Sequence, residues 1–242
     1  MWHAAMWGAV SGSAVLLGSL AAMFFSLPKK VIGFIMAFGT GVLIGAASYE
    51  LIGEAVHKGG ITSTAIGFLS GAALFTLFDY MISRRGASHR KRSGTQAAES
   101  AGIAIFIGTI IDAVPESIMI GASLLEQDSV SFLLVIAIFV SNIPEGLSST
   151  AGMRKNGYSK TKIFVMWFSV LVIATISSWA GFFFLDGASN ALMAGISAFA
   201  GGGIIAMIAS TMMPEAFEES GPITGFITAL GLLASLILNH FA

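Results

Sequence analysis

Long apolar runs separated by short polar or Gly/Pro interruptions make up nearly the whole chain. A transmembrane helix needs about 20 consecutive apolar residues, and these runs reach that length without the alternation of a barrel strand. The pattern therefore predicts an all-α integral membrane protein with eight transmembrane helices. The expected spans are 4–27, 31–56, 61–83, 99–124, 129–152, 162–185, 189–213 and 222–241.

The composition agrees with a membrane location. The 242 residues are 55% hydrophobic and 10% charged, whereas soluble domains are about 45–50% apolar and about 25% charged. The longest polar stretch, RRGASHRKRSGTQ at 84–96, predicts a flexible loop at about 84–98. We expect residues 1–242 to form a single transmembrane domain, and the absence of cysteine excludes disulfides and thiolate metal ligands.

Positive charge is confined to alternate loops. Of the 12 Lys and Arg residues, all but Lys58 fall between spans 1 and 2, 3 and 4, or 5 and 6. Short cytoplasmic loops collect Lys and Arg, so these loops should face the cytoplasm and both termini the outside. Topology explains the basic loop without a nucleic acid partner.

An internal repeat accompanies this topology. Residues 37–55 align without gaps on residues 198–216 at an offset of 161, sharing Ala-Phe, a Gly and the final Glu-Ala. The offset also relates span 1 to span 6 and span 3 to span 8. Five spans is an odd number, so the two three-helix repeats, 1–3 and 6–8, should be inverted and flank spans 4 and 5. Such repeats are typical of secondary transporters.

Two similar polar motifs lie in the middle of spans 4 and 5, DAVPES at 112–117 and SNIPEG at 141–146. Asp112 and Glu116 are four residues apart and share a helix face, as do Ser141 and Glu145, with Asn142 adjacent. An acid at this depth costs about 2.5–3.5 kcal/mol on insertion scales. The motifs therefore predict a cation site formed by oxygen ligands, provided that the two helices face each other.

The prolines strengthen this interpretation. Each removes the hydrogen bond to the carbonyl four residues earlier, which frees the carbonyl groups of Ile111 and Val140. The alternative is structural: Pro115 and Pro144 only kink the helices, and the glutamates are neutral and bonded to neighbouring helices.

The chain resembles the ZIP (Zrt/Irt-like) family of divalent-metal transporters in these motifs, in the Pro-Glu-Ala closing span 7, and in its eight spans with a basic loop between spans 3 and 4. The resemblance implies that Glu116 and Glu145 are metal-bridging carboxylates. Asp112 stands at a position usually occupied by His, Ser141 at the His/Gln position of span 5, and Asn142 at its Asn/Asp position.

Departures from the family pattern bear on the metal. Ala113 replaces a ligand, and span 6 lacks the acid that family members often carry, which argues against a binuclear site. Zn²⁺ is the substrate that the resemblance implies. The all-oxygen ligand set suits hard or borderline ions such as Mn²⁺, Fe²⁺ or Mg²⁺, and Cd²⁺ is a further candidate substrate. We expect no organic cofactor.

Further acids lie near the ends of the spans. Glu50, Glu54 and His57 are near the outer end of span 2, and Glu215 is at the inner end of span 7. They are candidates for entrance and exit stations that concentrate cations. The alternative is that they are solvated helix ends.

These features predict metal transport into the cytoplasm by a multi-pass protein of the inner (plasma) membrane. The expected partners are the lipid bilayer and metal cations, and a homodimer is left open. A proton-coupled carrier of a non-metal solute would use the same acids as proton relays. An enzyme is not expected because the sequence contains no Ser/His pair and no HExxH motif.

Overall fold

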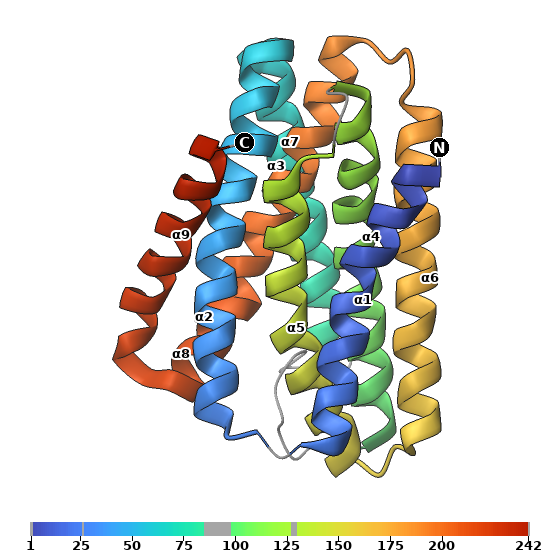
Figure 1. Ribbon diagram of the computed structural model, residues 1–242, viewed down its shortest axis with the longest axis vertical. Helices are drawn as coiled ribbons and strands as arrows, with labels where there is room; N and C mark the ends of the chain where they lie inside the picture. The colour runs from blue at the N-terminus through green and yellow to red at the C-terminus, as the bar shows by residue number, and fades with distance from the viewer. Residues whose placement is uncertain (1, 26, 85–97, 127–129, 242) are drawn as a thin grey trace.

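The computed structural model describes residues 2–25, 27–84, 98–126 and 130–241, and these residues form a bundle of helices without strands (Figure 1). This confirms the all-α class predicted from the apolar runs. The predicted loop at about 84–98 lies almost wholly outside the described residues. The elements are α1 (Trp2–Phe24), α2 (Lys29–Ala46), η1 (Ala47–Gly53), α3 (Glu54–Arg84), α4 (Ala98–Glu126), α5 (Phe132–Lys155), α6 (Lys160–Phe184), α7 (Asn190–Met207), η2 (Ile208–Met212), α8 (Met213–Ser220), η3 (Gly221–Ile223) and α9 (Thr224–Phe241).

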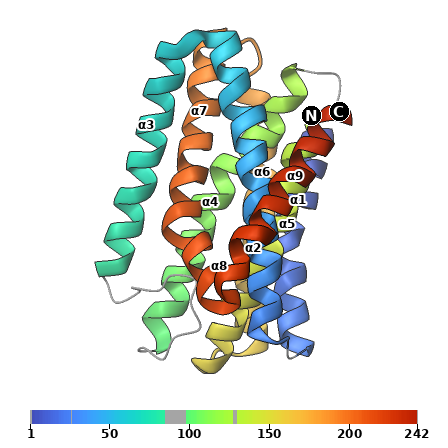
Figure 2. The same ribbon diagram turned by 90° about the vertical axis from the view of Figure 1, so that its left-hand side faces the viewer.

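Six of the described helical segments are long and apolar enough to cross a membrane. Two of the six, Lys29–Met81 and Asn190–Phe241, exceed 50 residues and turn back at a glycine with positive φ. Gly60 has φ 77° and Gly221 has φ 74°, a conformation that glycine adopts without steric cost. Each long segment therefore contains two legs (Figure 2), and the number of membrane crossings stays a prediction.

The two long segments share their internal spacing. α2 begins at Lys29 and gives way to the π-helix η1 at Ala47, and α7 begins at Asn190 and gives way to the π-helix η2 at Ile208. Both pairs of positions, like Gly60 and Gly221, are separated by the offset of the sequence repeat. α2 and α7 run in opposite directions along the bundle (Figure 1). π-helical turns are rare and frequently occur at functional sites.

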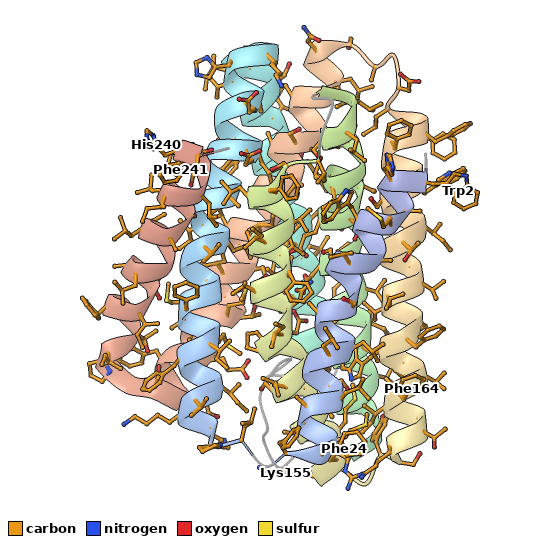
Figure 3. All side chains as sticks on the ribbon, viewed as in Figure 1. Trp2, Phe24, Lys155, Phe164, His240 and Phe241 are labelled. Carbon is orange, nitrogen blue, oxygen red and sulfur yellow. The ribbon has the colours of Figure 1, made fainter. Side chains whose placement is uncertain are left out.

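The two ends of the chain lie at one end of the bundle. Figure 3 shows Trp2 and Phe241 toward this end, and Lys155 at the opposite end. The basic residues that follow α1 and flank the α5–α6 turn are at the Lys155 end, whereas Lys58 lies near the turn at Gly60. This separation is the one expected from the loop charges.

The helices form two groups that differ in their packing partners. The first group contains α1, α4, α5 and α6, and the second contains α2, α3, α7, α8 and α9; α2 and α5 form the main contact between the groups. Within each group, backbones meet at glycines. A Cβ on Gly146 would overlap the Val15 carbonyl of α1, and a Cβ on Gly71 would overlap the Phe199 carbonyl of α7. Small residues permit this close approach in membrane bundles.

Candidate metal site

The five residues predicted to bind a cation all lie in the interior of the bundle. α4 and α5 continue as helices through Pro115 and Pro144, which places both motifs near the middle of membrane-length segments. Glu116 is 2% exposed and Glu145 is 3% exposed. Asp112, Ser141 and Asn142 are also buried. Burial of carboxylates requires hydrogen bonds, protonation or a cation.

A hydrogen bond connects the two motif helices at this depth. The Oγ1 hydroxyl of Thr109 on α4 donates to Oε1 of Glu145 on α5 at 2.7 Å. Thr109 precedes Glu116 by two helical turns, so it lies on the same face of α4 as Asp112 and Glu116. The acid-bearing face of α4 thus meets α5 at Glu145.

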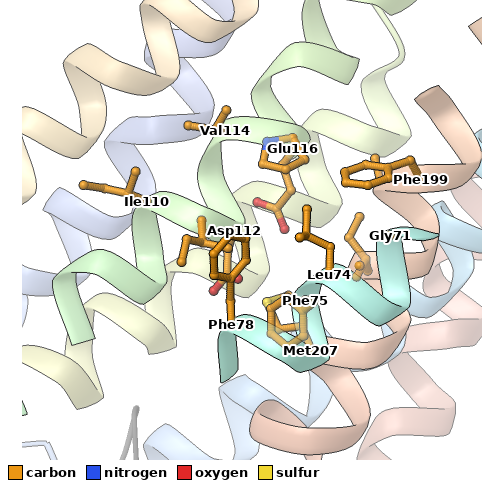
Figure 4. A pocket seen from close by; sticks show the side chains of 15 residues that line it. Gly71, Leu74, Phe75, Phe78, Ile110, Asp112, Val114, Glu116, Phe199 and Met207 are labelled. Carbon is orange, nitrogen blue, oxygen red and sulfur yellow. The ribbon is translucent and has the colours of Figure 1, made fainter. Parts of the chain in front are cut away.

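Asp112 and Glu116 line a cavity of about 300 Å³ between α4 and the pair α3–α7. Figure 4 shows both side chains on the side of α4 that faces Leu74, Phe75 and Phe78 of α3. Except for the two carboxylates, the wall of this cavity is apolar. Glu145 does not line the cavity. Its surroundings therefore differ from those of Asp112 and Glu116.

No three His, Asp or Glu side chains of the described residues are arranged to hold a metal ion. A metal at this depth would therefore need other oxygen ligands besides the acids. Ser141 donates its hydroxyl to the Ile138 carbonyl at 3.0 Å, and its oxygen retains acceptor capacity. The Val140 carbonyl lies beside Gly39 of α2, 3.2 Å from the position of a Cβ there. The complete ligand set stays a prediction.

Glu215, a candidate exit station, lies near the end of the bundle that carries Lys155. It is 3% exposed, so it is not a solvated helix end. The hydroxyl of Ser148 on α5 donates to Oε1 of Glu215 on α8, which connects the two groups of helices. Ser148 also lines a second cavity of about 340 Å³ that Lys29, Lys155 and Glu219 border.

The three candidates near the opposite end have different surroundings. Glu50 in η1 accepts a hydrogen bond from Ser131 Oγ at 2.7 Å, at the N-terminus of α5. Glu54 forms a 2.9 Å ion pair with Lys58, and both side chains are partly exposed. His57 is exposed. Exposed ion pairs contribute about 0–1 kcal/mol, so Glu54 has little structural role.

Three hydroxyl residues at these sites were not predicted. Thr109, Ser131 and Ser148 each donate to one of the candidate acids. The helical spacing from Glu116 to Thr109 and from Glu145 to Ser148 offered a signal, because residues three, four or seven apart share a face. Their carboxylate partners lie on other helices, and hydroxyls are frequent in this sequence.

Buried acids in the middle of membrane-length helices are typical of membrane transport proteins, because such residues mark ion or proton pathways. A comparison with curated proteins agrees. The chain is 24% identical over 213 residues to an Arabidopsis thaliana protein named "Putative zinc transporter At3g08650". The alignment covers 87% of this chain and 34% of the relative, so the chain spans about a third of the relative's length. No family model matches the chain. The relative confirms the predicted resemblance to a zinc transporter.

Proposed function

We propose that this protein carries divalent metal cations across the bilayer, with zinc as the first candidate substrate because the similar plant protein is named for zinc. The observation that supports the proposal most directly is the burial of Asp112, Glu116 and Glu145 at the middle of α4 and α5. A cation can offset the cost of three acids at this depth.

The proposed topology has eight crossings, with both termini outside the cytoplasm. The reversals at Gly60 and Gly221 supply the two additional crossings beyond the six apolar segments. The matched starts of α2 and α7 and of η1 and η2 support an inverted repeat of spans 1–3 and 6–8. The Lys and Arg residues at the Lys155 end support a cytoplasmic position for that end.

The proposed ligands are the carboxylates of Asp112, Glu116 and Glu145, with the amide oxygen of Asn142 and the hydroxyl of Ser141. Thr109 positions Glu145 through its 2.7 Å hydrogen bond. This set contains only oxygen donors, so Mn²⁺ and Fe²⁺ are candidate substrates besides Zn²⁺. Cd²⁺ is a softer ion and serves as a comparison in the same assay. Carboxylates bind metal when deprotonated, so protons should compete with the metal.

The proposed path connects this site to the cytoplasm through Ser148 and Glu215. Ser148 lies one turn beyond Glu145 on α5 and borders the cavity that contains Lys155. All five proposed ligands belong to the first group of helices. A movement of that group along the second would carry the site as one unit, and uptake into the cytoplasm across the inner (plasma) membrane is the direction that we propose.

Proteoliposome uptake tests this function. Purified parent protein should accumulate Zn²⁺ above empty liposomes, and Glu116→Gln with Glu145→Gln should reduce the rate about tenfold or more, equivalent to at least about 1.4 kcal/mol. Glu218→Gln is the matched control because Glu218 is an exposed acid on α8 that is neither a candidate ligand nor a candidate station. Equal uptake by the parent and the double variant would refute the site.

The alternative is a proton-coupled carrier of a non-metal solute. The apolar wall beside Asp112 and Glu116 favours it, because such a surface contacts an organic molecule better than a hydrated ion. Removal of divalent metal by a chelator distinguishes the two. Proton movement driven by an organic solute in chelated buffer would favour the alternative, whereas proton movement only with added metal supports metal transport.

A further inference from the structure

The cavity beside Asp112 and Glu116 is larger than a metal ion needs. Its volume is about 300 Å³, which corresponds to the volume of about ten water molecules at about 30 Å³ each. A buried water needs two to four polar partners, and the charged side chains that the described residues place in this wall are the two carboxylates. The volume instead lies at the lower limit of small-molecule pockets, about 300–1,000 Å³.

The chemistry of the wall combines negative charge with aromatic and thioether groups. Phe75 and Phe78 of α3 and Phe199 of α7 lie across the cavity from the carboxylates (Figure 4). Aromatic faces attract organic cations, and a carboxylate accepts strong hydrogen bonds from an ammonium group. An ammonium head with an apolar body would match both parts of the wall.

One part of the cavity wall lies at the outer surface of the bundle. Leu74 lines it and is 40% exposed, and Leu74 lies in the middle of the α3 leg that follows Gly60. If this leg crosses the bilayer, the mouth of the cavity faces lipid at mid-depth. An amphiphilic amine that partitions into the bilayer could enter from the side.

We propose that this cavity is a binding site for lipophilic organic ammonium ions. The ammonium group binds Asp112 and Glu116, and the apolar body occupies the space between α3 and α7. Bound amine then excludes divalent metal from the same carboxylates and inhibits transport; this consequence rests on the proposed function. Binding of the amine itself does not depend on metal transport.

The direct test is ligand binding by fluorine NMR to protein in lipid nanodiscs. The probe is a fluorophenylbutylammonium ion, and the matched neutral probe is the corresponding fluorophenylbutanol. Empty nanodiscs measure partition into lipid. We expect the amine to bind the parent at least about tenfold more tightly than the alcohol. Asp112→Asn with Glu116→Gln should abolish this difference.

Gly203 offers a way to fill the cavity without changing a charged residue. A Cβ at Gly203 would meet only the Gly71 carbonyl, at 3.9 Å, so Gly203→Leu should enter the cavity and Gly203→Ala should leave most of it open. We expect the leucine variant to lose amine binding and the alanine variant to retain it. Leu74→Trp, at the mouth, is a second blocking variant if Gly203→Leu fails to fold.

Each outcome decides the proposal. Equal binding of amine and alcohol would show that the cavity holds any apolar chain and does not recognise the ammonium group. Binding that persists in both blocking variants would show that the amine binds elsewhere. Either result overturns the proposal. Displacement of bound amine by Zn²⁺ supports competition at the carboxylates. If amine binds but Zn²⁺ uptake by the parent is absent, the proposed function fails and the ammonium site stands.

Discussion

The two groups of helices differ in what they contribute to the interior. The first group carries the paired motifs on α4 and α5, with Asp112, Glu116 and Glu145 buried at mid-length. The second group contributes an apolar wall from α3 and α7 and the reversals at Gly60 and Gly221. The proposed ligands therefore share one group, and the other group supplies a surface with few competing ligands.

The packing differs in the same way. Within each group, glycines bring backbones so close that a Cβ would overlap a facing carbonyl, as at Gly146 and Gly71. Between the groups, a Cβ on Gly39 would lie 3.0 Å from the Ser141 Cα, and the hydrogen bonds from Ser131 and Ser148 reach Glu50 and Glu215. Each group is thus suited to act as a rigid body, and the contact between them is the place where movement is expected.

The largest effect should follow from a side chain inside one group. Gly71→Val would drive Cβ into the Phe199 carbonyl, and neither backbone can yield cheaply. Overpacking of a core typically costs about 1–3 kcal/mol, so we expect loss of folded protein or a clearly lower thermal unfolding midpoint in detergent. Gly225→Ala is the control because a Cβ there meets nothing within 4 Å. If Gly71→Val and Gly225→Ala have equal midpoints, the contact between Gly71 and Phe199 does not stabilise the second group of helices.

A smaller effect is expected between the groups. Gly39→Ala places a methyl group against Ser141, where a shift of a few tenths of an ångström can accommodate it. We expect a folded protein with a near-parent midpoint and metal uptake slowed by several-fold, because the two groups would move past each other less easily. Unchanged uptake would argue against movement along this contact.

The hydrogen bond between Ser148 and Glu215 should affect stability less than Gly71→Val does and more than Gly39→Ala does. Glu215→Ala leaves the buried Ser148 hydroxyl without this acceptor, which costs about 1–3 kcal/mol, whereas Glu215→Gln retains an acceptor oxygen. We therefore expect the alanine variant to be less stable and the glutamine variant to keep its midpoint but to take up metal more slowly. If both variants keep parent uptake rates, Glu215 is not part of the path.

The smallest effect should occur at Glu54. Its ion pair with Lys58 is partly exposed, and such pairs contribute about 0–1 kcal/mol. Glu54→Gln should leave the thermal unfolding midpoint near that of the parent. It should change the uptake rate by less than about twofold. A large loss of uptake measured at low metal concentration would instead identify Glu54 as an entrance station.

The sequence predicted several parts of the fold and site because they depend on local chemistry. Apolar runs of membrane length predicted the helices, and the break expected between the runs at 31–56 and 61–83 falls at Gly60, where the backbone leaves the helical conformation. The π-helical segments η1 and η2 left no signal in the hydrophobic pattern, since they change the hydrogen-bond spacing without changing residue polarity.

By itself, the sequence determined the helical class, the positions of Asp112, Glu116 and Glu145 near the middle of their helices, and the grouping of Lys and Arg between apolar runs, since each follows from polarity and its spacing along the chain. The tertiary structure alone decided which surfaces meet. It bonded Thr109 to Glu145 and Ser148 to Glu215 and directed Asp112 and Glu116 toward an apolar cavity. These pairings depend on how helices distant in sequence are rotated and how closely they approach. Contacts at glycines set that rotation and distance, and they form only when the helices pack.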